Sequence, residues 1–475
     1  MIQNNQEPRN FLFFLSDIHP LNLEDTLIGA LAVDSSWDVV AETVNKARQK
    51  DAFARSLNKA SLYIHVPFCS RICTFCHCPK VLLRRHSEID DYIKVLLRQM
   101  MYFSLVYKDM DTSALCFGGG TPSILNEAEM TTVLDGVDEA FPSSNRKIYT
   151  EIHPTSWTAS KLAALSARGL YRASIGIQSF DEKVLKDVAR SQTKKQVLWC
   201  LRSSRKAAVP RLNVDLIAGL PGQTFKGFMS DLKLVIKEGV NEIHLQPYTS
   251  FAKDELKKMG ETFSEFSQRR DAMMRAGEEF VLASGFRCKG LGGYLRDDKE
   301  VIKPEWEYLL PKRAFAAFGP FAMGEFPGAV FYRAGTSDPA HEFPMVKVAA
   351  QNSGYAMSQY ALLAAINGLD EEVFLKYFGV SLDKHCGEGL RYLQRYGLLA
   401  FSEGKWKFSG KWEFRRVREY AALSRVLFGD EILSRLKTKL SNRYNPQYDY
   451  DNNETSLFKA FTQNWLMTLY YQKRV

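Results

Sequence analysis

The cysteines of this chain are its most informative residues, because half of the eight fall within ten consecutive positions. They lie in the segment IHVPFCSRICTFCHCPK and are Cys69, Cys73, Cys76 and Cys78. A structural zinc site normally needs a second pair of ligands, and the other four cysteines are scattered singly. Disulfides would not require such tight spacing and are rare in reducing compartments. One loop with three thiolates can instead hold three irons of a [4Fe-4S] cube and leave the fourth iron open to a substrate.

Other unusual residues follow β-rich runs between residues 61 and 290. Short β-rich runs alternate there with helical stretches, which predicts six parallel strands in an α/β barrel or part of one. Ligands gather at the carboxyl ends of parallel strands. The residues at or near those ends, besides the cysteines, are Gly118 to Pro122, Glu151, Gln178 and Asp215. Each alone is usually a turn or a satisfied polar group, but their shared position predicts a single pocket.

Composition indicates a globular protein with enough apolar residues for a large core. The chain has 475 residues, of which 45% are hydrophobic and 12% aromatic, and this length suggests two domains or one large domain with additions. No apolar run approaches the roughly 18 to 20 residues of a membrane span. The apolar residues near the N-terminus are followed by acidic residues rather than a cleavage region, so we expect no signal peptide and a cytoplasmic location.

The net charge of +9 does not by itself indicate a nucleic-acid partner. The most basic stretch, residues 411–443, reads as amphipathic helices with solvated charged faces. We therefore expect neither nucleic acid nor a membrane as a partner.

Beyond the cysteine spacing, the chain resembles a known family, the radical S-adenosylmethionine (SAM) enzymes, whose signature is C-x3-C-x2-C after the first barrel strand. The segments SLYIHVPFC, FGGGTPS, SIGIQSFDEKVL and VDLIAGLPGQT occur in the order typical of the subgroup built around oxygen-independent coproporphyrinogen III oxidase. The resemblance is specific over roughly residues 60 to 260 and weaker to about residue 430. It implies an α/β fold: a radical SAM partial (β/α)6-type barrel followed by a smaller, mainly helical, winged-helix-like C-terminal domain.

The resemblance also implies cofactors and roles for individual residues. Cys69, Cys73 and Cys76 are expected to bind a [4Fe-4S] cluster, whose open iron is chelated by the amino and carboxylate groups of SAM; a second SAM is expected. Residues assigned to SAM are Gly118, Gly119, Gly120, Thr121, Glu151, Gln178, Arg190 and Asp215. Tyr63 is expected at the rim of the cluster. Cys78 is expected near the cluster but outside its ligands, either as a small buried hydrophobe or with a direct catalytic role.

The chemistry of these side chains suits the implied roles. Glycines at 118–120 let the backbone approach a zwitterionic amino acid closely. Glu151 can accept hydrogen bonds from ribose hydroxyls, and Gln178 can both donate and accept. Arg190 could pair bidentately with a carboxylate.

Two departures from the oxidase bear on the reaction. The N-terminal segment lacks the expected Tyr-Pro-Thr turn, and Pro320 and Phe321 interrupt the glycine-rich segment expected near the second SAM. We therefore predict SAM-dependent C-methylation or cyclopropanation of an unsaturated or tetrapyrrole-like substrate. Oxidative decarboxylation of coproporphyrinogen III to protoporphyrinogen IX remains an alternative, which the retained Cys78 favours. A non-catalytic, haem-binding iron–sulfur protein is a second alternative.

The expected domain organisation follows from these assignments. We expect an N-terminal helical extension (1–59), the radical SAM core (60–290), a connecting region (291–350), a C-terminal domain that covers the substrate (351–430), and a linker with a terminal helix (431–475). A reducing flavodoxin or ferredoxin is the expected electron donor.

Overall fold

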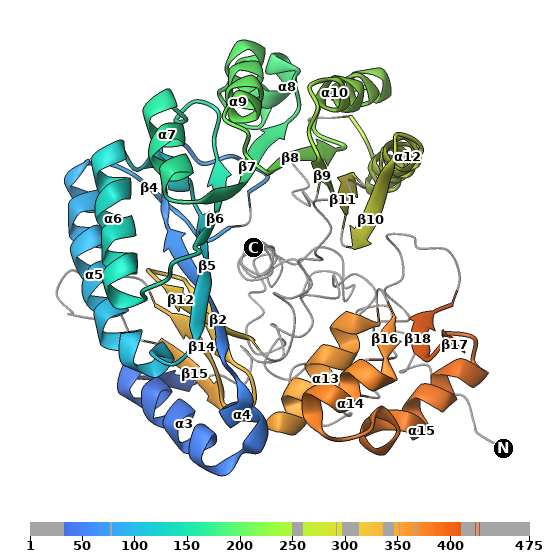
Figure 1. Cartoon of the computed structure of the whole chain (residues 1–475). Helices are drawn as coiled ribbons and strands as arrows, with labels where there is room; N and C mark the ends of the chain where they lie inside the picture. Colours follow the sequence, from blue (N-terminus) through green and yellow to red (C-terminus); the bar gives the residue numbers. More distant parts are fainter. Residues whose placement is uncertain are drawn as a thin grey trace, which may run out of the picture.

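One large curved sheet dominates the computed structural model of this protein (Figure 1). The described residues are 33–76, 78–248, 260–290, 292–296, 313–335, 346–350, 352–365 and 368–409, with residues 423 and 427. Within them the sheet has thirteen strands, in the order β1-β15-β14-β13-β12-β2-β5-β6-β7-β8-β9-β11-β10. Helices cover its convex side. The predicted α/β class is confirmed.

The centre of the sheet is a run of six parallel strands in sequence order. They are β2 (Lys59–Val66), β5 (Asp111–Gly119), β6 (Lys147–Ile152), β7 (Leu170–Gln178), β8 (Arg211–Ala218) and β9 (Glu242–Pro247). Successive side chains of a strand point to opposite faces. In β2, Leu62 and Ile64 pack in the apolar core, while Tyr63 and His65 alternate with them. The partial (β/α)6-type barrel expected from the sequence is therefore confirmed.

The connecting helices follow their strands and pack on the convex side. They are α5 (Ser87–Tyr107), α6 (Glu127–Ala140), α7 (Ala159–Ala167), α8 (Glu182–Asp187), α9 (Lys194–Lys206), α10 (Phe225–Lys237) and α12 (Phe263–Ala283). Capping boxes fix several starts, as at Asn126 with Glu129 and Thr193 with Gln196, because each pair satisfies backbone N–H groups left free in the first turn.

The region after the barrel contributes strands to the same sheet. Residues 291–350, expected to be a connecting region, include β11 (Gly293–Arg296), β12 (Arg313–Phe318), β13 (Met323–Phe326), β14 (Val330–Ala334) and β15 (Val346–Ala350). β12 pairs in parallel with β2 on the side away from β5. β11 pairs antiparallel with β9 and with β10 (Phe286–Gly290). β2 is therefore an interior strand.

The N-terminal part is helical with one short strand. β1 (Val33–Ser35) pairs with β15, and α3 (Trp37–Lys50) and α4 (Ala52–Ser56) follow. The Trp37 ring packs edge-on against Phe103 of α5, with 4.9 Å between the ring centroids. Residues 1–32 of the expected extension lie outside the described residues.

The C-terminal unit joins three helices to a small sheet. Its elements are α13 (Ser353–Ala364), β16 (Leu369–Asp370), α14 (Glu371–Phe378), α15 (Leu382–Arg395), β17 (Leu399–Ser402) and β18 (Lys405–Phe408). β17 and β18 form a hairpin around Gly404, whose φ of 72° suits a tight turn. The mainly helical, winged-helix-like unit is thus confirmed.

Several predicted segments fall outside the described part of the chain. These include most of the basic stretch 411–443 and all of the linker and terminal helix at 431–475. No helix among the described residues combines the length and apolar character needed to cross a bilayer.

Candidate functional site

The residues singled out in the sequence come to one end of the parallel strands. Tyr63 lies in β2, Gly118 and Gly119 end β5, Glu151 lies near the end of β6, Gln178 ends β7, and Asp215 lies in β8. These five strands are consecutive neighbours in the sheet. The cysteine loop follows β2, and Arg190 lies between α8 and α9. The topology therefore gathers side chains that are up to 152 positions apart in the sequence.

A two-strand ladder closes the cysteine loop. β3 (Phe68–Cys69) pairs in parallel with β4 (Val81–Leu82), and two backbone hydrogen bonds flank the pair. The Val81 N–H donates to the Pro67 carbonyl at 2.8 Å, and the Leu83 N–H donates to the Cys69 carbonyl at 2.9 Å. The loop is thus held at both ends, so its thiols are positioned by backbone pairing.

The thiols of Cys69 and Cys73 each meet a polar neighbour. Cys69 Sγ lies 3.3 Å from Thr121 Oγ1, and burial raises the pKa of Cys69 to about 11. Arg190 Nη1 lies 3.9 Å from Cys73 Sγ. Burial raises the pKa of Cys73, while the Arg190 guanidinium opposes that rise. Thr121 and Arg190 therefore favour the thiolate forms that metal binding requires.

Cys76 and Cys78 form a pair. The Cys78 thiol hydrogen-bonds to Cys76, and this contact lowers the pKa of Cys76 and raises that of Cys78. Lys80 Nζ donates to the carbonyls of Cys76 at 2.7 Å and Cys78 at 3.0 Å, which brings a positive charge beside both. Glu151 also raises the pKa of Cys78 through its negative charge. Of the two thiols, Cys76 is therefore the one whose pKa is lowered.

The donor set of this loop fits a multi-iron cluster. Cys69 interacts electrostatically with both Cys73 and Cys76, so the three thiols lie near one another. Within the described residues, no three His, Cys, Asp or Glu side chains converge on a point that could hold one metal ion. A cube does not require such convergence, because each cysteine binds a different iron.

The glycines that end β5, and Gly120 directly after it, leave no room for side chains. A Cβ atom at Gly120 would lie 2.6 Å from the Pro67 carbonyl oxygen, and one at Gly118 would lie 2.9 Å from the Tyr63 hydroxyl. Gly119 has a φ of 109°, which L side chains rarely adopt. The β5 end therefore approaches the start of the cysteine loop as closely as bare backbone permits.

Tyr63 is linked to the cysteine loop through a residue that sequence reasoning did not single out, His65. The His65 Nε2–H donates to the Pro79 carbonyl at 3.0 Å, which leaves Nδ1 to accept from the Tyr63 hydroxyl at 3.1 Å. Both side chains are buried. The alternation that places Tyr63 on the inner face also places His65 there, and this signal could have found it.

Arg190 is oriented by protein groups before any ligand binds. Its Nε donates to Gln192 Oε1 at 2.9 Å, and its Nη2 donates to the Gly176 carbonyl. A Cβ atom at Gly176 would lie 3.1 Å from both Arg190 and Gln178. Gln178 is buried with a φ of 64°. The guanidinium is therefore a fixed positive charge beside Cys73 rather than a free bidentate fork.

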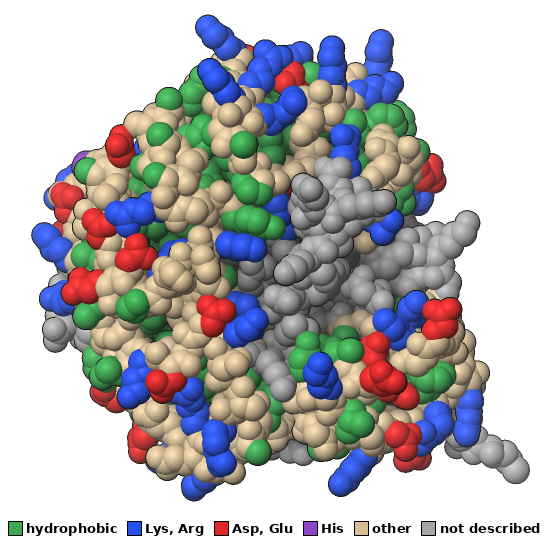
Figure 2. Space-filling view, viewed as in Figure 1, with side chains coloured by type: hydrophobic (Ala, Val, Ile, Leu, Met, Phe, Trp, Pro, Cys, Tyr) green, Lys and Arg blue, Asp and Glu red, His purple; other side chains and the backbone are tan. Residues whose placement is uncertain are grey.

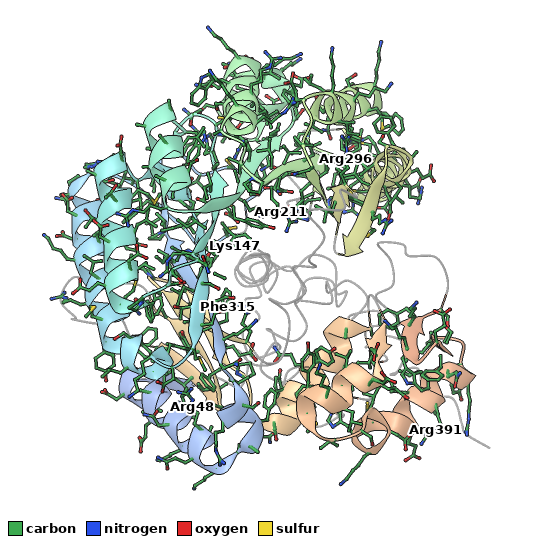
Figure 3. All side chains as sticks on the ribbon, viewed as in Figure 1. Arg48, Lys147, Arg211, Arg296, Phe315 and Arg391 are labelled. Carbon is green, nitrogen blue, oxygen red and sulfur yellow. The ribbon has the colours of Figure 1, made fainter. Side chains whose placement is uncertain are left out.

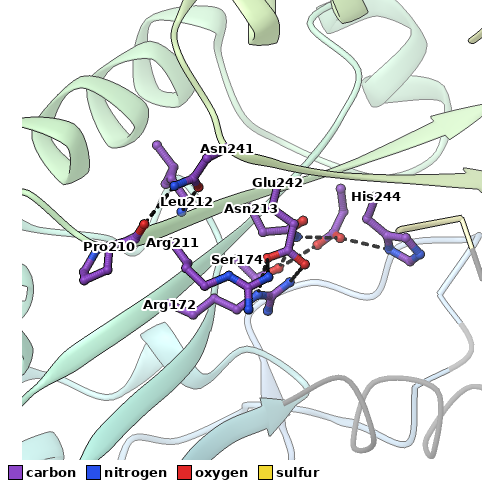
Figure 4. Close-up of polar contacts among 10 residues, drawn as sticks. Arg172, Ser174, Pro210, Arg211, Leu212, Asn213, Asn241, Glu242 and His244 are labelled. Carbon is purple, nitrogen blue, oxygen red and sulfur yellow. Dashed lines mark hydrogen bonds and ion pairs between the residues drawn. The ribbon is translucent and has the colours of Figure 1, made fainter. Parts of the chain in front are cut away.

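The Asp215 carboxylate is held by three neighbours, Ser174, Asn213 and His244, which are labelled in Figure 4. The Ser174 hydroxyl donates to its Oδ2 at 3.1 Å, and Asn213 Nδ2 donates to its Oδ1 at 3.1 Å. His244 Nδ1 lies 3.1 Å from the same Oδ1, and the imidazole donates because a carboxylate only accepts. His244 was not expected from the sequence. Its place in β9, next to β8, explains the contact.

A buried ion triad lies at the start of the neighbouring strands. Glu242 accepts from Arg172 Nε at 2.8 Å and Nη2 at 3.0 Å, and from Arg211 Nη2 at 2.8 Å (Figure 4). Arg211 of β8 and Phe315 of β12 lie on the concave side of the sheet (Figure 3). The Phe315 ring stacks on Tyr63 with 5.7 Å between centroids. The ion triad therefore lies below the carboxyl ends of the strands. No spacing of residues in the sequence predicted it.

Comparison with known proteins identifies a matching family model and several similar proteins. The family model "Radical SAM superfamily" matches residues 63–235. The chain is 29% identical over 255 residues to an oxygen-independent coproporphyrinogen III oxidase of Escherichia coli (strain K12), covering 53% of this chain and 55% of that protein. The chain therefore spans about half the length of the first curated relatives it matches. It is 28% identical over 395 residues to the Helicobacter pylori (strain ATCC 700392 / 26695) protein of the same name, covering 76% of this chain and 86% of that one.

Two further similarities are informative. The heme chaperone HemW of Bacillus subtilis (strain 168) is 32% identical over 168 residues, which covers 35% of this chain and 44% of that one. Among solved structures, coproporphyrinogen III oxidase (HemN) from Escherichia coli matches with a TM-score of 0.70 at 20% identity, covering 83% of this chain and 93% of that one. The structural match supports the fold.

Proposed function

Since the chain belongs to the radical SAM superfamily, as a relative of the oxygen-independent coproporphyrinogen III oxidases, we propose that it is an enzyme that generates a 5'-deoxyadenosyl radical and acts on a tetrapyrrole-like substrate. The observation that carries the proposal is the cysteine loop. Three thiols of one short loop lie near one another, with Arg190 and Lys80 beside them and the bare backbone of residues 118–120 against the loop.

The chain's own residues would hold the cluster and set its surroundings. Cys69, Cys73 and Cys76 are the proposed ligands, and when bound, a [4Fe-4S] cluster would supply the electron that cleaves the sulfonium of SAM. Arg190 and Lys80 offset the negative charge of the thiolates. Phe68 is buried beside the loop and excludes water from it. Cys78 is buried and hydrogen-bonds to Cys76, which supports a place outside the ligand set.

SAM would lie along the carboxyl ends of β5 to β8. The backbone of residues 118–120 can approach its amino acid part, because no side chain intervenes. Glu151 is half-exposed and can accept hydrogen bonds from the ribose. Arg190 would present its fixed positive charge to the SAM carboxylate. Asp215, with its carboxylate held by three side chains, would contribute a fixed negative charge rather than an adaptable contact.

Two observations bear on which reaction follows. The named oxidase relatives and the retained Cys78 support oxidative decarboxylation of coproporphyrinogen III. The segment after β12 departs from the oxidase pattern. There Phe321 adopts a φ of 65° and sets its ring edge-on to His65, with 6.1 Å between the ring centroids. A bulky aromatic ring therefore takes the place of the small residues expected in the oxidase. This departure argues against the oxidase reaction and keeps SAM-dependent C-methylation or cyclopropanation as the leading proposal.

The test is anaerobic reconstitution with iron and sulfide, followed by addition of SAM and dithionite. Formation of 5'-deoxyadenosine together with S-adenosylhomocysteine is expected for alkylation. 5'-Deoxyadenosine alone, increasing with added coproporphyrinogen III, would support the oxidase. An intact cluster that binds haem and forms neither product would contradict both reactions and support a non-catalytic haem-binding protein.

Matched cysteine variants test the ligand assignment. Cys76→Ala is expected to lose bound iron, the cluster absorbance and all SAM cleavage. Cys386→Ala is the control, because Cys386 lies in α15 of the C-terminal unit. Retention of turnover in Cys76→Ala would show that the ligand set is wrong.

A further inference from the structure

His244 is a buried imidazole that the proposed function does not use. It lies in β9 and is 1% exposed, and its partner in the neighbouring strand β8 is Asp215. Its Nδ1 lies 3.1 Å from Asp215 Oδ1 and carries the hydrogen, because a carboxylate only accepts. Gln246 Nε2 also lies 3.1 Å from this nitrogen, but it cannot donate to an atom that already carries a hydrogen. One tautomer of His244 is therefore fixed, with its hydrogen directed at Asp215.

The two other groups that hold the Asp215 carboxylate are also bound to each other. Asn213 Nδ2 donates to Asp215 Oδ1 at 3.1 Å and to Ser174 Oγ at 2.7 Å, and the Ser174 hydroxyl donates to Asp215 Oδ2 at 3.1 Å. Asn213 is 0% exposed and Ser174 is 4% exposed. Because the donors of both side chains are already engaged, neither can take the place of the imidazole.

A buried positive charge competes for Asp215. Arg172 binds Glu242 nearer the amino end of β7 and also interacts electrostatically with Asp215. Figure 2 shows Lys and Arg side chains that project from α8, α9 and α10, but these are exposed to solvent, where screening weakens their effect on a buried carboxylate. The competing charge is therefore Arg172. It draws Asp215 towards the amino ends of the strands, whereas His244 holds it beside β9.

We propose that His244 is a positioning residue for SAM, because its Nδ1–H keeps the Asp215 carboxylate turned towards the site at the carboxyl ends of the strands. This inference rests on the proposed function, which gives Asp215 its contact with SAM. His244 acts through Asp215 and does not touch the ligand. Loss of its hydrogen bond lets Asp215 turn towards Arg172, and the affinity for SAM falls.

Two substitutions of His244 separate this role from the filling of space. Asparagine carries its amide nitrogen at the position of Nδ1, directly on the carbon that follows Cβ, and so keeps a donor to Asp215. Glutamine is closer to histidine in size, but its nitrogen lies one bond further out, at the position of Nε2. A positioning role predicts that asparagine replaces histidine better, whereas a role in packing predicts that glutamine does.

SAM affinity is measured by calorimetry on the full chain with a reconstituted, oxidised cluster and no reductant, so that SAM is bound but not cleaved. Circular dichroism and bound iron verify that each variant is folded and loaded. We expect His244→Gln to weaken SAM binding about tenfold or more, and His244→Asn to stay within about threefold of the wild type. Affinity of His244→Gln equal to or higher than that of His244→Asn would overturn the proposal.

A double variant tests the competition with Arg172. If Arg172 draws Asp215 away once the imidazole hydrogen bond is lost, Arg172→Met/His244→Gln should bind SAM several-fold more tightly than His244→Gln alone. Glu242 keeps its hydrogen bond from Arg211 in this double variant. Affinity of the double variant equal to or lower than that of His244→Gln would also overturn the proposal.

The control substitution is His385→Gln. His385 lies in α15 of the C-terminal unit, where its Nε2 is 3.1 Å from the Ser358 hydroxyl, and its loss should leave SAM affinity unchanged. A similar loss of affinity in this variant would overturn the specific role of His244. A loaded wild type that binds no SAM would contradict the proposed function and this inference with it. A wild type that binds SAM, with the two His244 variants in the reverse order, would overturn this inference alone.

Discussion

Replacement of Glu242 by glutamine tests the contribution of the buried ion triad to stability most sharply. The Glu242 carboxylate accepts two hydrogen bonds from Arg172 and one from Arg211, all between 2.8 and 3.0 Å. The three side chains are only 3%, 8% and 1% exposed, respectively. Glutamine keeps the size of the side chain but removes its charge. Two buried guanidinium groups then lose the carboxylate that they share.

The expected cost follows from that burial. Removal of one partner from a buried ion pair destabilises a protein by about 3 to 5 kcal/mol, since the remaining charge stays desolvated. Asp215 also interacts with Arg172 electrostatically and offsets part of the loss. We therefore expect Glu242→Gln to lower the free energy of unfolding by about 3 kcal/mol, near the lower end of this range. Asp215 would also be drawn towards Arg172, which should weaken SAM binding.

The matched control is Glu238→Gln. Glu238 accepts from Arg202 Nε at 3.0 Å and Nη2 at 2.7 Å, the same two-bond geometry, but the Arg202 side chain is 63% exposed. Denaturant midpoints of the cluster-free proteins are measured by circular dichroism, with SAM affinity as a second readout. Glu242→Gln should lower the midpoint far more than Glu238→Gln. Similar shifts for both would refute the argument from burial.

Three further predictions follow from individual contacts. Gly120→Ala should prevent cluster incorporation, measured as bound iron, because its Cβ would lie 2.6 Å from the Pro67 carbonyl oxygen. The control Gly354→Ala should bind iron like the wild type, because its Cβ would meet only the end of the Asn352 side chain. Burial raises the pKa of Asp231 from 3.8 to about 6, so folding favours its protonated form. As the pH rises from 4 to 8, the wild type should therefore lose up to about 3 kcal/mol of unfolding free energy relative to Asp231→Asn. Parallel stability–pH profiles of the two proteins would contradict this. Arg190→Gln should slow alkylation of Cys73 by iodoacetamide in the cluster-free protein several-fold, since the guanidinium no longer opposes the rise of the Cys73 pKa; an unchanged rate would contradict this cause.

Local patterns predicted much of the fold and of the candidate site. The parallel core was predictable because strand and helix signals alternate, and its topology then brings Glu151, Gln178 and Asp215 to one edge. The hairpin at Gly404 was predictable from turn residues. These features depend on residues close in the sequence or on a rule that holds for parallel sheets in general.

The missed features depend on contacts between distant segments. The pairing of β12 with β2 lets Arg313 donate a side-chain hydrogen bond to Ser61, 252 positions away, and nothing in either segment specifies its partner. The hydrogen bond from His244 to Asp215 and the binding of Glu242 by two arginines arise only after the strands are in register. A single sequence shows polar residues in such strands but not which of them will meet.

The parallel pairing of β12 with β2 also constrains the order of events during synthesis. The strand that leads into the cysteine loop leaves the ribosome long before residues 313–318, its partner on one side. Until those residues emerge, β2 is an edge strand whose unpaired backbone groups can recruit other chains. A nascent chain that stops short of residue 313 therefore presents its thiols from an incomplete sheet. Stable loading of the metal centre is expected to wait until the second half of the protein has been translated.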